Sequence, residues 1–112
     1  MENHKKMAEY IYSILLSQPT ILMSWGFQSP RIINQGLLFI VNGFKHKGRV
    51  SIKYNEAQDL FDVYLMDETD KIVETINMVY LDQLVEVIDE RVEKTDDYKG
   101  RVNNEYFKMK FY

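Results

Sequence analysis

Residues 37–79 decide the fold, and they read LLFIVNGFKHKGRVSIKYNEAQDLFDVYLMDETDKIVETINMV. A half-buried strand alternates apolar and polar side chains, because successive residues point to opposite faces of the sheet. Residues 49–55 alternate in this way, and residues 60–66 keep the same period with a less polar outer face. Residues 37–44 have apolar side chains at odd and at even positions, which is typical of a central strand with both faces covered. With residues 71–79, the pattern predicts four strands in succession.

Short polar turns connect these strands. Gly48 follows Lys45-His46-Lys47 and supplies the positive φ that a short hairpin turn needs. Residues 67–70 can form such a turn less easily, because Asp tolerates the left-handed region better than most residues. Residues 55–59 are a longer polar loop. Since a parallel return requires a crossover of a dozen or more residues, connections this short force neighbouring strands to run antiparallel. The segment is therefore predicted to be an antiparallel meander.

Amphipathic helices are predicted on both sides of the meander. The apolar residues of about 3–18, and again those of about 80–94, recur three and four positions apart, which is the spacing of one helical face. Pro19 is expected to end the first helix. Residues 1–112 are thus predicted to form a single α+β domain, in which a four- to five-stranded antiparallel meander is covered on one face by an N-terminal and a C-terminal helix.

Two segments are less regular. Residues 20–34 contain ILMSWGF, which fits either a short extra strand or an apolar loop, and Ser29-Pro30 is typical of a turn before the meander. Residues 105–112, EYFKMKFY, alternate again. They predict a terminal strand that pairs with an edge of the meander or with another chain, and their lysines would protect that edge.

The composition excludes several classes of protein. A chain of 112 residues is expected to build one core. The absence of Cys rules out disulfides, thiolate metal sites and cysteine nucleophiles. A net charge of -3 argues against a general binder of phosphate backbones, and no apolar run approaches the ~20 residues of a membrane span. We expect a cytoplasmic protein with no membrane association.

No motif identifies a reaction centre. The sequence lacks the nucleotide-binding, zinc-protease, serine-hydrolase and complete calcium-loop patterns. An active site would need a deep pocket in which two of Asp59, Asp62, Glu74 or His46 converge. Acidic residues four apart in residues 80–94 fit a solvated helix face better than a metal site, although such a face is also a possible partner surface. The sequence favours a protein that is not an enzyme, with no cofactor and no metal.

Four residues are candidates for contact with a partner protein: Trp25, Phe27, Tyr64 and Met66. Aromatic residues and Met are enriched at protein interfaces, and Tyr64 and Met66 are expected on the sheet face away from the helices. For Trp25 and Phe27 the alternative is that they close one end of the core. We expect protein–protein contacts, with a homodimer as one form of them.

The alternative function is nucleic-acid binding through a basic hairpin. Lys45, Lys47, Arg49 and Lys53 lie close together in the sequence, where they are placed to contact phosphates, and tyrosine rings on the sheet offer faces for single-stranded bases. A solvated hairpin tip is the ordinary explanation of such a cluster.

Overall fold

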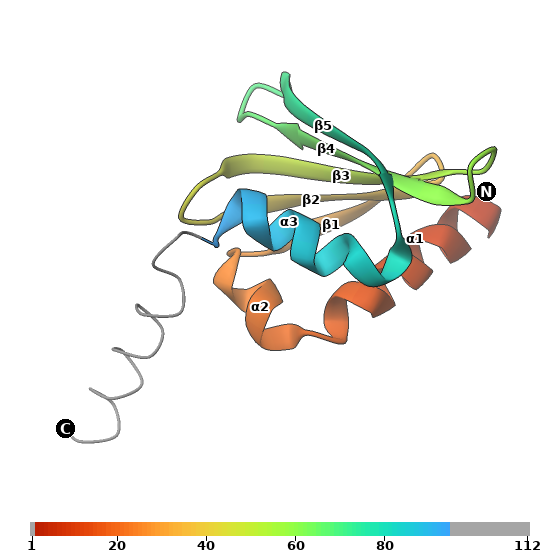
Figure 1. Ribbon diagram of the computed structural model, residues 1–112, viewed down its shortest axis with the longest axis horizontal. Coiled ribbons are helices and arrows are strands. Elements are labelled where there is room, and N and C mark those ends of the chain that lie inside the picture. Colours follow the sequence, from red (N-terminus) through yellow and green to blue (C-terminus); the bar gives the residue numbers. More distant parts are fainter. Residues whose placement is uncertain (1, 95–112) are drawn as a thin grey trace.

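The computed structural model describes residues 2–94. In chain order the elements are α1 (Glu2–Leu16), α2 (Pro19–Ser24), β1 (Gln28–Ile33), β2 (Gly36–Asn42), β3 (Lys47–Asn55), β4 (Leu60–Met66), β5 (Ile72–Val79), the 3-10 turn η1 (Leu81–Gln83) and α3 (Leu84–Val92). The strands form one antiparallel sheet in the order β1-β2-β3-β4-β5, and the helices lie on one side of it (Figure 1). This arrangement confirms the predicted α+β fold with its meander sheet.

The core lies between the helices and one face of the sheet. Alternate residues of β2, β3 and β4 supply the sheet side of the core, and α1 and α3 supply Ile11, Leu15, Leu84, Ile88 and Val92. The strand residues in this core are Leu37, Phe39, Val41, Val50, Ile52, Phe61, Val63, Leu65 and, from β5, Val79. Period-two hydrophobicity in the sequence therefore identified the buried face of the meander.

The strand predicted at residues 37–44 differs from its expectation in two respects. It ends at Asn42, and Phe44 is exposed. No helix within residues 2–94 covers its second face, where Leu38 and Ile40 are only half-buried. The expectation that both faces are covered is wrong because all helices of the described chain lie on one side of the sheet.

Residues 19–33 form two elements that the sequence did not resolve. Pro19 follows the end of α1 as predicted, but it also begins α2, since a proline in the first turn of a helix has no N–H to lose. Pro30 lies inside β1 and not in a turn. The pairing of β1 with β2 shifts register between Gln28 and Arg31, and Ser29 has a φ of 54°. Pro30 is therefore at a bulge in an edge strand, where its missing N–H is tolerated.

Gly48 in β3 and Asp67 in the turn after β4 show how single residues shape the two hairpins. Gly48 has the predicted positive φ, but it lies within β3, where a Cβ atom would come 2.2 Å from the Met66 carbonyl oxygen of β4. In the β4–β5 turn, Asp67 Oδ1 accepts hydrogen bonds from the Thr69 hydroxyl and from the N–H groups of Lys71 and Thr69. These bonds favour the carboxylate and lower the pKa of Asp67.

The predicted terminal strand at 105–112 lies outside the described residues.

Candidate functional site

The side of the sheet that faces away from the helices is the first candidate binding surface. Strand register assigns its residues: Leu38 of β2 pairs with Arg31 and Ser51, Ser51 pairs with Tyr64, and Tyr64 pairs with Thr75. We call this surface the open face, and its members are Arg31, Leu38, Ile40, Arg49, Ser51, Lys53, Asp62, Tyr64, Met66, Ile72 and Thr75.

An apolar row crosses the middle of the open face. Leu38, Ile40, Tyr64 and Met66 are half-buried there. Ser51 is only 5% exposed, although none of the described helices covers it, because it lies in register between Leu38 and Tyr64. The row therefore consists of an apolar pair on β2 and an apolar pair on β4, with Ser51 and Arg49 of β3 between them. Uncovered apolar residues of this kind often mark an interaction site in soluble proteins.

Charged side chains of both signs lie around the apolar row. The ammonium of Lys53 is 5.9 Å from the centre of the Tyr64 ring, and Lys53 pairs in register with Asp62. Arg49 forms an ion pair with Asp70 of the β4–β5 turn. The open face therefore combines apolar side chains with charged side chains of both signs, as protein interfaces do.

The four predicted partner residues lie in two different places. Tyr64 and Met66 lie on the open face. Trp25 is 0% exposed, and Phe27 is half-buried, with its ring centre 4.7 Å from that of Phe39. The burial of Trp25 agrees with the alternative interpretation, that these two aromatic residues close one end of the core. The candidate surface therefore rests on Tyr64 and Met66.

Sequence reasoning missed the partner of Trp25. The indole Nε1 donates a hydrogen bond to Asp89 Oδ1 over 2.9 Å, and Asp89 is 6% exposed. From the sequence, Asp89 was expected among the solvated acidic residues of the predicted helix at about 80–94, whereas the structure buries it. In the sequence, burial of Asp89 is indicated only by its position directly after Ile88, at the edge of the apolar face of this predicted helix.

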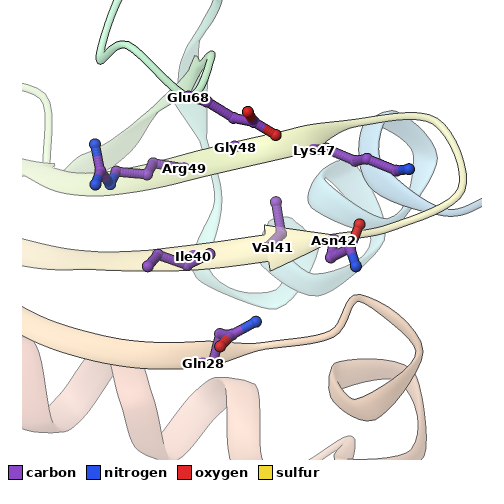
Figure 2. A pocket seen from close by; sticks show the side chains of 8 residues that line it. All are labelled: Gln28, Ile40, Val41, Asn42, Lys47, Gly48, Arg49 and Glu68. Atoms are coloured by element: carbon purple, nitrogen blue, oxygen red, sulfur yellow. The ribbon is translucent and has the colours of Figure 1, made fainter.

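A hollow of about 520 Å³ lies at one end of the open face. Figure 2 shows its lining side chains, which come from β1, β2, β3 and the turn after β4. They are Gln28, Ile40, Val41, Asn42, Lys47, Gly48, Arg49 and Glu68. The polar members are two amides, two cations and one carboxylate, which suit hydrogen bonding to polar groups of a partner.

The structure divides the predicted basic cluster. Lys45 is turned toward the end of α3, where its ammonium donates to the Glu90 carbonyl oxygen and its N–H donates to the Val92 carbonyl oxygen. Lys47 and Arg49 line the hollow, and Lys53 lies over Tyr64. Arg49 and Lys53 therefore lie on the open face and Lys47 lies in the hollow at its end, whereas Lys45 stabilises the carboxyl end of a helix.

The four groups considered for catalysis each contact a different partner. Asp59 Oδ1 accepts a hydrogen bond of 2.6 Å from the Tyr54 hydroxyl, and this bond raises the pKa of Tyr54. Asp62 accepts from the Met78 N–H, Glu74 pairs with Arg91, and His46 Nε2 lies 3.0 Å from the Met66 carbonyl oxygen. This arrangement suits structural roles for all four side chains.

Comparison with known proteins finds no relative: no family model, no curated protein and no solved structure matches the chain. Within residues 2–94, no helix is long and apolar enough to cross a membrane. Over the same part of the chain, no three His, Asp or Glu side chains gather closely enough to hold a metal ion.

Proposed function

We propose that this protein is a small cytoplasmic binding module, without chemistry of its own, that pairs through its open face with the same face of a second copy. The observation that carries the proposal is the uncovered apolar row of Leu38, Ile40, Tyr64 and Met66. The helices bury the central strands on the other sheet face, so this row is the part of the central strands that gains most from a partner.

The charges of the open face suit self-association. A two-fold dimer places the same patch on both copies, so each patch must complement itself. The face and its rim carry Arg31 and Lys53 as well as Asp62 and Glu68. With both signs present, rotation about a two-fold axis can set cations of one copy opposite acids of the other.

The area of the sheet also supports a dimer of moderate affinity. Five strands spaced about 4.8 Å apart and about seven residues long cover roughly 24 by 24 Å, or about 580 Å² on each copy. Two copies would then bury roughly 1,150 Å², which lies just above the ~1,000 Å² expected of a specific interface and below the standard size. We therefore expect micromolar and not nanomolar association.

Size-exclusion chromatography with light scattering tests the dimer. At ~100 μM, above the micromolar range of ordinary association, the wild type is expected to have twice the monomer mass of 13.4 kDa. Met66→Lys places a charge in the apolar row beside Arg49 and is expected to give monomers. A monomeric wild type at this concentration contradicts the proposal.

Met23→Lys is the matched control. Met23 lies in α2 and is 79% exposed on the helix side of the molecule, so the same substitution there is expected to leave the dimer intact. Dissociation of both variants to the same extent would assign the effect to added charge and not to the open face. Far-ultraviolet circular dichroism of each variant checks that the fold is retained.

The alternative proposal is single-stranded nucleic-acid binding on the same face. It rests on the Lys53 ammonium beside the Tyr64 ring and on Lys47 and Arg49 in the hollow at one end of the open face, since a ring for stacking together with cations suits bases and phosphates. It predicts oligonucleotide binding that weakens steeply with salt and is lost when Lys47 and Arg49 are replaced by Ala. Absence of binding at ~50 mM salt contradicts it.

A further inference from the structure

A second hollow, distinct from the open face, is lined by residues of α1, of the β3–β4 hairpin and of the segment after β5. Figure 1 shows the turn between β3 and β4 beside the start of α1. Its volume is about 480 Å³, and its lining is more apolar than polar. Both the size and the lining are in the range of pockets that bind small organic groups.

Three tyrosines from three separate elements line this hollow. Tyr10 comes from α1, Tyr54 from the end of β3, and Tyr80 from the link between β5 and η1. Tyr10 is 48% and Tyr80 is 58% exposed, so neither is used to fill the core. The faces of such rings carry negative electrostatic potential and attract cations.

The charge around the hollow is negative. Asp59 and Asp82 line it, and among its described lining residues there is no Lys or Arg. An adjoining hollow shares Tyr10 and Tyr54 and contains Lys6 and Glu56, whose charges offset each other. Two carboxylates therefore remain to complement a bound cation.

A hydrogen bond links the aromatic and acidic parts of the hollow. The Tyr54 hydroxyl donates to Asp59 Oδ1 over 2.6 Å, and Asp59 is held in the turn after β3 with a φ of 54°. Donation to a carboxylate shifts electron density onto the phenol ring and strengthens its attraction for a positive charge. The Tyr54 and Phe61 rings also contact each other, with centres 5.5 Å apart, which fixes the position of the Tyr54 ring.

We propose that this hollow binds an organic ammonium group between the rings of Tyr10, Tyr54 and Tyr80, with Asp59 and Asp82 supplying the opposite charge. Alkyl substituents of such a group fit the apolar lining provided by Leu60, and its charge suits the rings and the carboxylates. The site is independent of the dimer, because it lies beside the helices and not on the open face.

Titration of the full-length ¹⁵N-labelled chain, followed by backbone amide resonances, tests the proposal. Choline carries the quaternary ammonium, and 3,3-dimethylbutan-1-ol has the same shape without the charge. Choline is expected to shift the resonances around residues 54–61 and 80–82 in a saturable way, whereas the neutral analogue has little effect. Equal responses to both compounds, or choline shifts elsewhere in the sequence, overturn the proposal.

Two exposed positions provide variants with matched controls. Tyr80→Leu removes a ring and is expected to weaken choline binding about two- to fivefold, whereas Tyr80→Phe keeps the ring and retains the affinity. Asp82→Asn removes one charge at constant shape and also weakens binding. If Tyr80→Leu and Tyr80→Phe bind choline equally well, the rings do not hold the cation and the assignment fails.

Nα-acetyl-lysine methylamide identifies the source of the ammonium group. Tighter binding of this compound than of choline assigns the site to a lysine side chain of a polypeptide. Tighter binding of choline assigns it to a free alkylammonium compound. Failure of both to shift the resonances of residues 54–61 and 80–82 overturns the proposal.

Discussion

The contribution of the buried hydrogen bond between Trp25 and Asp89 to the stability of the fold can be tested by substituting Asp89. The indole N–H of Trp25 donates to Asp89 Oδ1 over 2.9 Å, and both side chains are buried. Asp89→Ala removes the acceptor and leaves the indole N–H without a partner, which costs about 1–3 kcal/mol. Asp89 lies in the second half of α3, where a carboxylate opposes the helix dipole, and its loss returns roughly 0.3–1 kcal/mol.

The net expectation for Asp89→Ala is a loss of roughly 1–2 kcal/mol of unfolding free energy. Asp89→Asn keeps an oxygen acceptor and removes the charge, so its loss is expected to stay below about 1 kcal/mol. Glu86→Ala removes an exposed acid from the same helix and is expected to change stability by no more than about 0.5 kcal/mol.

Urea unfolding followed by the fluorescence of the single tryptophan measures all three variants. With an m value of about 1.5 kcal/mol/M, Asp89→Ala is expected to lower the midpoint by about 1 M. The emission of the native state is expected to change as well, because the indole loses its hydrogen-bond acceptor. The reasoning is refuted if Asp89→Ala unfolds at the same urea concentration as Glu86→Ala.

Two further predictions concern hairpins. A Cβ atom on Gly43 would lie 2.4 Å from both Cγ1 and the carbonyl oxygen of Val92. Gly43→Ala is therefore expected to separate the β2–β3 hairpin from α3 and to lower the unfolding free energy, measured with urea, by about 1–3 kcal/mol. An unchanged urea midpoint would contradict a close contact between Gly43 and Val92. Because the folded pKa of Asp67 lies below its ordinary value of 3.8, its stabilising effect is complete above pH 3.8 and is lost as the pH falls through the lower folded value. The stability difference between wild type and Asp67→Asn should therefore shrink in acid unfolding experiments below pH 3.8, and a difference that does not depend on pH contradicts this assignment.

The central strands were predictable because burial on one sheet face imposes a local pattern. Val50 and Ile52, and likewise Phe61, Val63 and Leu65, alternate with polar or half-buried residues, and the structure buries all five. A positive φ at Gly48 was also predictable, since it is a property of a single residue, although the structure places Gly48 within β3 and not in the turn.

The remaining elements depend on contacts that a local pattern does not contain. α2 has six residues, too few to show a helical period. β1 is paired across a bulge at Ser29 and Pro30, which reads as a turn when its partner strand is unknown. The Trp25–Asp89 bond joins residues 64 positions apart, so neither residue reveals it alone.

The tyrosine-lined hollow could not be found from the sequence for the same reason. Tyr10, Tyr54 and Tyr80 come from three elements, and only the packing of α1 beside the β3–β4 turn brings them together. Tyr54 shares the parity of Val50 and Ile52, which indicated a core position. The structure leaves it half-buried at the end of the core, bonded to Asp59.

The most direct measurement of the central claim is a filtered nuclear Overhauser experiment on an equimolar mixture of ¹³C-labelled and unlabelled chains at ~100 μM or above. If two copies pair through the open face, the Met66 and Leu38 methyl groups of labelled chains give cross-peaks to Tyr64 ring protons of unlabelled chains. Intermolecular cross-peaks confined to residues of the helix side, such as Met23, or no intermolecular cross-peaks at all, would contradict the account.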